Sequence, residues 1–319
     1  MGLADRNFEW IDTNGVRLRA VVEGDGPLVI LLHGFPQCWY LWRHQIDPLL
    51  AAGFRVAAPD QRGYGDSDKP PEISDYGIRD LCADVDGIAT SLGHDDYALL
   101  IHDWGCIVGY HTALLYPDHV RAVAALSVPY VRSPLWKEMC TQEFHGDDFF
   151  YWAHFQTPGV VEAELEADVR TTLLAMYYGG SGDAPEPDPN APPKPASQGF
   201  LEGITLPDAL PPWLSEADLD YYVATFERSG FRGPVNWYRN LPRLLELTPE
   251  LEGVQIEPPV YFMMGARDGV RHFIPPDGME ARYRDLRAKV FVEGKGHWLP
   301  LEATREVNEH VIPFLGEFR

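Results

Sequence analysis

Short apolar runs alternate with stretches of helical character in the first half of the chain, and this alternation constrains the fold most. The runs fall at residues 28–32, 55–58, 97–101 and 123–126. Continuous apolar runs of this length are typical of parallel strands, because helices cover both faces of a parallel sheet. Similar runs return at residues 259–264 and 289–292. The sequence therefore predicts an α/β fold with a mainly parallel sheet and helices on both faces.

The middle of the chain has a different character. From residue 133 to residue 246 the strand pattern disappears, and the sequence becomes helical and rich in aromatic side chains. We expect this segment to be a helical cap inserted into a core formed by residues 1–132 and 247–319. Six prolines between Pro185 and Pro195 predict an extended or mobile surface loop inside the cap.

Composition limits the partners and the compartment. A net charge of −22 would repel nucleic acid and anionic membranes, so we expect neither as a partner. No apolar run has the length that spans a bilayer, and the amino terminus lacks the pattern of a secretory signal. The four cysteines are dispersed without metal-ligand spacing, which favours reduced thiols over a disulfide framework. These features predict a cytoplasmic protein without a metal site, and the acidic surface allows either a monomer or a homodimer.

Asp103 stands at a turn between a predicted strand, residues 97–102, and a predicted helix that begins at Trp104. A hydrolase nucleophile occupies such a strand-to-helix turn. An aspartate there is already ionised, so it can displace a leaving group from saturated carbon and form an ester with the enzyme. The substrate should then carry a strained or departing group on saturated carbon. The alternative is that Asp103 only caps the helix.

Loops at the carboxyl ends of neighbouring strands supply further candidates, because α/β folds bind ligands at this edge. Gly34 follows the first apolar run and permits a close turn, which leaves the Phe35 N–H free to point into the site. Together with the Trp104 N–H it would form an oxyanion hole. The alternative is that Phe35 and Pro36 are ordinary turn residues.

Asp268 and His297 follow the last two predicted strands. The chain order of nucleophile, acid and histidine is the order of one large class of hydrolase triads. Asp268 would orient His297 and stabilise its charged form while His297 draws a proton from water. Asp277 and Glu293 are weaker candidates for the acid, and the loop at residues 127–130 offers no carboxylate.

Several motifs together resemble those of the soluble epoxide hydrolases of the α/β-hydrolase superfamily, and the resemblance covers nearly the whole chain. The core motifs lie at residues 33–36, 60–65, 102–105 and 296–298. Two cap segments, residues 151–159 and 230–240, resemble the family segments that each place a tyrosine over the nucleophile. The resemblance implies that Tyr151 and Tyr238 donate hydrogen bonds to the epoxide oxygen. A phenol with a pKa of ~10 can donate to the alkoxide that ring opening generates; the alternative is two core tyrosines.

Ile101 and Cys106 depart from the family pattern, because relatives usually have small residues on both sides of the nucleophile. A branched side chain at position 101 needs small neighbours or a slightly altered turn. Neither residue touches a reacting atom, but because of both departures the family pattern does not predict the shape of the pocket or its range of substrates.

The resemblance implies a cofactor-independent reaction. Asp103 attacks a ring carbon, the two tyrosines assist departure, and water activated by His297 hydrolyses the ester to release a vicinal diol. The expected substrate is a small apolar epoxide, and such an enzyme would serve detoxification. Cap and loop aromatics are expected to line the pocket, namely Trp152, Phe155, Trp237 and Trp298.

Two other interpretations stay open. A haloalkane or haloacid dehalogenase would use the same aspartate. Haloalkane dehalogenases, however, place Asn or Trp where Phe35 stands, and fluoroacetate dehalogenases place Arg where Trp104 stands. A non-catalytic binding protein could also keep the fold, because fold does not establish function.

Overall fold

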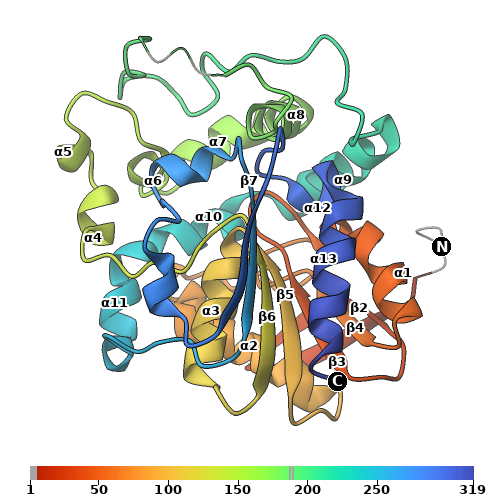
Figure 1. Ribbon diagram of the computed structural model, residues 1–319. Helices are drawn as coiled ribbons and strands as arrows, with labels where there is room; N and C mark the ends of the chain where they lie inside the picture. Colours follow the sequence, from red (N-terminus) through yellow and green to blue (C-terminus); the bar gives the residue numbers. More distant parts are fainter. Residues whose placement is uncertain (1–5, 187, 189) are drawn as a thin grey trace.

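The computed structural model describes residues 6–186, 188 and 190–319. Its centre is an eight-stranded sheet in the order β1-β2-β4-β3-β5-β6-β7-β8 (Figure 1). β2 runs antiparallel to both neighbours, whereas the other neighbouring strands are parallel, so the predicted mainly parallel sheet is confirmed. The strands are β1 Phe8–Thr13, β2 Val16–Glu23, β3 Leu28–Leu32, β4 Arg55–Pro59, β5 Tyr97–His102, β6 Val120–Leu126, β7 Val260–Gly265 and β8 Leu286–Val292.

All six predicted strands are present, and their ends move by only a few residues. β3 and β5 are buried along their whole length. A strand that is covered on both faces has no solvent side, so its sequence is a continuous apolar run rather than an alternating one. This burial explains why the central strands were predictable.

A β-hairpin at the amino-terminal edge of the sheet is absent from the prediction. β1 and β2 are joined by Asn14 and Gly15, which both have positive φ, at 42° and 77°. A two-residue hairpin turn with positive φ at both positions favours an Asn-Gly pair. The hairpin adds the antiparallel edge of the sheet.

Helices cover both faces of the sheet, as predicted. Figure 1 shows α1 and α13 on one side and α2 and α3 on the other. The core helices are α1 Arg43–Ala51, α2 Ile78–Ser91, α3 Trp104–Leu115, α12 Leu299–Glu302 and α13 Thr304–Gly316.

Between β6 and β7 the described residues form helices and loops and add no strand to the sheet. Figure 1 shows α6 to α9 above the sheet. Residues 1–5 of the predicted core, and Pro187 and Pro189 of the predicted proline loop, lie outside the described residues. The inserted helices are α4 Trp136–Met139, α5 Gln142–His145, α6 Tyr151–His154, α7 Val160–Glu166, α8 Val169–Gly179, α9 Glu216–Ser229, α10 Arg232–Arg239 and α11 Leu244–Leu247.

Polar contacts fix the inserted helices on the core. Ser215 begins α9 with a capping box, in which the Asp218 side chain accepts from the Ser215 N–H. The same Asp218 carboxylate lies 3.0 Å from Nε of Arg43 at the start of α1. Tyr177 of α8 donates its hydroxyl to the Pro36 carbonyl at 2.8 Å. The inserted segment is thereby tied to the loops at the carboxyl edge of the sheet.

Within the described residues, no helix is long and apolar enough to cross a bilayer. All four cysteines are buried and free.

Candidate active site

Asp103 lies in the turn between β5 and α3. Its backbone has φ 54° and ψ −121°, a conformation that non-glycine residues rarely adopt. A strained turn of this kind exposes the side chain of a nucleophile at the top of the sheet. The carboxylate makes no capping hydrogen bond to the described first turn of α3. Asp103 is therefore not a simple helix cap.

Glycines make room for the turn. A Cβ atom at Gly34 would lie 2.1 Å from Oδ1 of Asp103, and one at Gly105 would lie 2.1 Å from the Leu32 carbonyl oxygen. A Cβ atom at Gly109 would lie 2.7 Å from Cγ2 of Ile101. Gly109, one turn into α3, is therefore the small neighbour that accommodates the branched Ile101 side chain.

The loop after β3 reaches the nucleophile directly. The Phe35 N–H donates to Oδ1 of Asp103 at 2.7 Å. The sequence predicts this N–H as one donor of the oxyanion hole, and the structure places it at the carboxylate of Asp103. The Trp104 N–H belongs to the first turn of α3, where backbone donors have no partner within the helix; its role as the second donor stays a prediction.

His297 lies between the two carboxylates named by the sequence. Its Nε2 is 3.4 Å from Oδ2 of Asp103, and its Nδ1 is 3.1 Å and 3.2 Å from the two oxygens of Asp268. Asp268 is fully buried and accepts from the Val270 N–H at 2.9 Å. The structure thus brings the predicted nucleophile, base and acid together.

The two weaker candidates for the acid lie elsewhere. Asp277 and Glu293 are exposed, whereas Asp268 has no exposed surface. A solvated carboxylate cannot orient a buried histidine. Both are therefore excluded as the partner of His297.

Ser127, directly after β6, is a site residue that the sequence analysis missed. Its hydroxyl donates to Oδ2 of Asp268 and lies 2.7 Å from Nδ1 of His297. Its φ is 83°, in the left-handed region. Residues 127–130 contain no carboxylate and no catalytic motif that would single out the serine. The usable signal for Ser127 is its place in the chain directly after a predicted strand, because this loop lies at the carboxyl edge of the sheet beside β7.

The backbone around His297 is held on three sides. Its N–H donates to the Gly180 carbonyl and its carbonyl oxygen accepts from Nε2 of His102, both at 2.8 Å. The buried Glu302 carboxylate accepts three backbone N–H groups, from Gly182, Gly296 and Trp298, at 2.8, 3.0 and 2.9 Å. The histidine is thus fixed to the nucleophile strand and to the inserted segment.

Electrostatics favour a charged pair in the resting site. Burial alone would lower the pKa of His297, but the negative charges and hydrogen bonds of Asp268 and Asp103 raise it to about 10. Burial alone would raise the pKa of Asp103, but contact with His297 keeps it below the usual value. At neutral pH the site therefore holds an imidazolium and an ionised nucleophile.

Both predicted tyrosines line one small cavity together with Asp103. Tyr151 begins α6 and Tyr238 lies in α10, with ring centroids 5.8 Å apart. Burial, and then the nearby Asp103 charge, raise the pKa of each phenol, so both stay protonated donors. The cavity is lined by Asp103, Trp104, Ile107, Val128, Tyr151, Trp152, Tyr238, Val270, Phe273 and Ile274.

Only one of the four aromatics expected in the pocket lines this cavity. Trp152 does so, whereas Phe155, Trp237 and Trp298 are not among the lining residues. Phe155 packs its ring on Tyr151 and Tyr238. The indole N–H groups of Trp237 and Trp298 donate to the carbonyls of Arg62 and Tyr177. These three side chains do not line this cavity, and their contact with a substrate stays a prediction.

Comparisons with known proteins agree with this geometry. The family described as alpha/beta hydrolase fold matches residues 27–174. Epoxide hydrolase A of Mycobacterium tuberculosis is 42% identical over 313 residues, covering 96% of each chain. The crystal structure of Epoxide Hydrolase A from Mycobacterium thermoresistibile is 43% identical with a TM-score of 0.93, over 98% of this chain and 99% of that one. An epoxide hydrolase from an endophytic Streptomyces is 38% identical with a TM-score of 0.89, over 97% and 95%. This chain, which places an aspartate and two tyrosines around one cavity, belongs to the epoxide hydrolases of the alpha/beta hydrolase fold.

Proposed function

We propose that this protein hydrolyses epoxides to vicinal diols through an ester on Asp103. One observation carries the proposal: an ionised aspartate and two protonated tyrosines line a single cavity. The aspartate supplies a nucleophile for saturated carbon. The tyrosines supply a proton to the epoxide oxygen, which leaves the attacked carbon but stays bonded to the neighbouring carbon.

In the first step, Oδ2 of Asp103 attacks a ring carbon and the C–O bond of the epoxide breaks. Oδ1 is held by the Phe35 N–H, which leaves Oδ2 as the attacking atom. The ring oxygen takes a proton from Tyr151 or Tyr238. The imidazolium of His297 then replaces that proton, so the step ends with an ester, an alcohol and a neutral histidine.

In the second step, the neutral His297 becomes the base. Esterification removes the charge of Asp103, which is one of the two charges that raise the pKa of His297. His297 takes a proton from water, and the hydroxide adds to Cγ of Asp103. The Phe35 N–H stabilises the negative oxygen. The bond from Cγ to the alkyl oxygen then breaks while the imidazolium of His297 protonates that oxygen, which releases the diol and leaves His297 neutral. The carboxyl of Asp103 returns its proton to His297.

The lining of the cavity indicates the kind of substrate. Apart from the reacting groups it is largely apolar, with Ile107, Val128, Phe273 and Ile274 among its walls. An apolar epoxide and water are therefore the proposed reactants, and residues 133–246 are the proposed cap over them. We place the enzyme in the cytoplasm, where buried free thiols stay reduced, in a detoxifying role.

The test is product analysis with matched epoxides and haloalkanes for the wild type and Tyr238→Phe. We expect diol from epoxides, and a loss of about tenfold or more in the variant because one proton donor is gone. A departing halide is already an anion and needs no proton. Halide release that is indifferent to Tyr238 would identify a dehalogenase instead, and binding without any product would identify a non-catalytic protein.

A further inference from the structure

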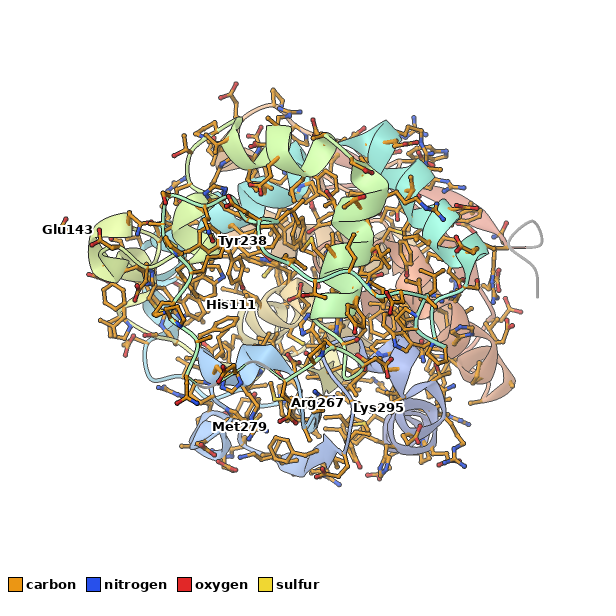
Figure 2. All side chains as sticks on the ribbon, turned by 90° about the horizontal axis from the view of Figure 1, so that it is seen from above. His111, Glu143, Tyr238, Arg267, Met279 and Lys295 are labelled. Carbon is orange, nitrogen blue, oxygen red and sulfur yellow. The ribbon has the colours of Figure 1, made fainter. Side chains whose placement is uncertain are left out.

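The indole N–H of Trp152 has no acceptor in the resting site. Trp152 follows Tyr151 on α6, is only 2% exposed, and lines the cavity that holds the reacting groups, here called the substrate cavity. Among the described residues, its Nε1 makes no hydrogen bond. Figure 2 shows Tyr238, from the same cavity, surrounded by side chains, whereas Glu143 lies at the rim of the molecule. Buried polar groups without partners are uncommon and costly, so this donor needs an explanation.

Two other buried indoles near the site do have acceptors. Trp237 donates to the Arg62 carbonyl at 3.1 Å, and Trp298 donates to the Tyr177 carbonyl at 2.7 Å. Neither of these two indoles lines the substrate cavity. Trp152 therefore differs from both in facing the reaction with a free donor.

Aromatic neighbours hold the Trp152 ring in place. The rings of Trp136, Phe150 and Phe273 meet it edge to face, with centroids 6.3, 5.4 and 5.8 Å away. Contacts of this kind favour one orientation of the ring. The N–H is thus a fixed donor, which needs no reorganisation when charge appears beside it.

Tyr151 is the group on which this N–H acts. The two rings have centroids 6.1 Å apart and an angle of 70° between their planes. Burial and then the Asp103 charge raise the pKa of the Tyr151 phenol, whereas the Trp152 N–H lowers it. A hydrogen bond to a charged oxygen is roughly twice as strong as one to a neutral oxygen. The donor is therefore suited to the phenolate form of Tyr151.

Ring opening creates this phenolate. When Tyr151 gives its proton to the epoxide oxygen, its own oxygen becomes negative in a buried site beside Asp103, and burial opposes that charge. The imidazolium of His297 then restores the proton, so the phenolate exists only during the first step. A donor that finds its acceptor only at that stage lowers the barrier without tightening the binding of the substrate.

We propose that Trp152 is a positioning residue for ring opening, which acts through Tyr151 and stabilises the phenolate that forms when this tyrosine protonates the epoxide oxygen. This inference rests on the proposed epoxide hydrolysis and deepens it, because it makes Tyr151 a proton donor and not only a hydrogen-bond donor. Tyr238 has an indole neighbour of its own, Trp104, with ring centroids 5.0 Å apart. The effect of Trp152 should therefore be confined to Tyr151.

The experiment measures ester formation and ester hydrolysis separately by rapid quench, with Trp152→Phe and with benzothienylalanine at position 152. The analogue keeps the shape of the indole and has sulfur in place of the N–H. Both changes should slow ester formation by about tenfold or more, because a hydrogen bond to a charged group is lost. Ester hydrolysis should keep its rate, because Tyr151 is protonated again before that step.

Two backgrounds identify the tyrosine that is involved. In Tyr151→Phe, the change Trp152→Phe should have no further effect on ester formation, because the phenolate cannot form. In Tyr238→Phe it should still slow this step by about tenfold or more, because Tyr151 then supplies the proton. Trp136→Phe is the matched control, because Trp136 packs on Trp152 without lining the substrate cavity, so both steps should keep their rates.

The possible results separate a role through Tyr151 from simple packing. Equal slowing of both steps, or equal slowing in the Tyr151→Phe background, would show that Trp152 only packs against the site and would overturn the inference. An analogue that forms the ester as fast as the wild type would overturn it too, because only the N–H is missing. Should Trp152→Phe fail to fold, the analogue in both backgrounds makes the same comparison. If the wild type hydrolyses no epoxide, the proposed function itself fails, which is a different result.

Discussion

The hydroxyl oxygen of Ser127 lies 2.7 Å from Nδ1 of His297, closer than either oxygen of Asp268, at 3.1 Å and 3.2 Å. Ser127 also donates to Asp268. The Ser127 hydroxyl therefore bridges Asp268 and His297, and both contacts hold the imidazole ring in place. Ser127 is a positioning residue, because it acts through His297 and does not reach the substrate cavity.

Ser127→Gly should show what the hydroxyl group contributes, because it removes that group without straining the backbone. Glycine tolerates the φ of 83°, so the variant relieves strain and should keep or raise the melting temperature. Loss of a hydrogen bond to a charged group should slow the hydrolytic step by about tenfold or more. Rapid quench should then show the Asp103 ester accumulating, whereas ester formation keeps its rate. Equal slowing of both steps would contradict a role through the base.

The protonation of His297 should depend on Asp103. Asp103→Asn removes one negative charge, so the pKa of His297 should fall clearly below the value of about 10. NMR titration of the ring in both proteins measures this directly. An unchanged titration would show that Asp103 does not hold the proton on His297, and the proposed change of role between the steps would fail.

The same raised pKa makes stability depend on pH. The folded protein favours the imidazolium, so the stabilisation is complete below the ordinary pKa of 6.5 and is lost as pH rises through about 10. The free energy of unfolding of the wild type should therefore fall more between pH 7 and 10 than that of His297→Asn. Denaturant unfolding across this range is the measurement, and parallel curves would contradict it.

Glu302, on the short helix α12, should contribute strongly to the free energy of unfolding. Glu302→Ala leaves three buried backbone N–H groups without their acceptor, which should cost about 3 kcal/mol or more of unfolding free energy. Glu309→Ala, at an exposed site on α13, is the matched control and should change it by about 0.5 kcal/mol or less. Similar losses for both variants, seen by chemical denaturation, would contradict the role of Glu302.

Gly109 and Ile101 should be energetically coupled. Alanine is the better helix former by about 1 kcal/mol, but its Cβ would meet Ile101 at 2.7 Å. Overpacking of this kind costs about 1–3 kcal/mol, so Gly109→Ala should destabilise the wild type. In the Ile101→Ala background the clash is gone, and the same change should be neutral or stabilising. A double-mutant cycle without coupling would reject the contact.

The sequence predicted the parts of this molecule that follow from burial or from local turns. β3 and β5 are covered on both faces, so their apolar runs were unambiguous. The edge hairpin was missed because β1 is partly exposed and lacks such a run, although Asn14-Gly15 was a usable turn signal. The triad was predictable because parallel strands place their following loops at one edge.

The supports of the site were not predictable in the same way. Ser127 contacts Asp268, which lies 141 positions away in the chain, and Glu302 contacts Gly182, which lies 120 positions away. Neither Ser127 nor Glu302 belongs to a sequence motif. Aromatic content in the inserted segment indicated an apolar site but not which ring faces it. Trp152 lines the cavity, whereas Phe155 packs behind the tyrosines, and only tertiary packing decides between them.

The central claim is that the aspartate forms the covalent bond. A single turnover in oxygen-18 water, with enzyme in excess over epoxide, tests it by mass spectrometry of the diol and of the peptide that carries Asp103. Because water attacks Cγ of the ester, the label should enter Asp103 and the first diol should be unlabelled. Label that appears directly in the diol, with none in Asp103, would contradict the covalent mechanism.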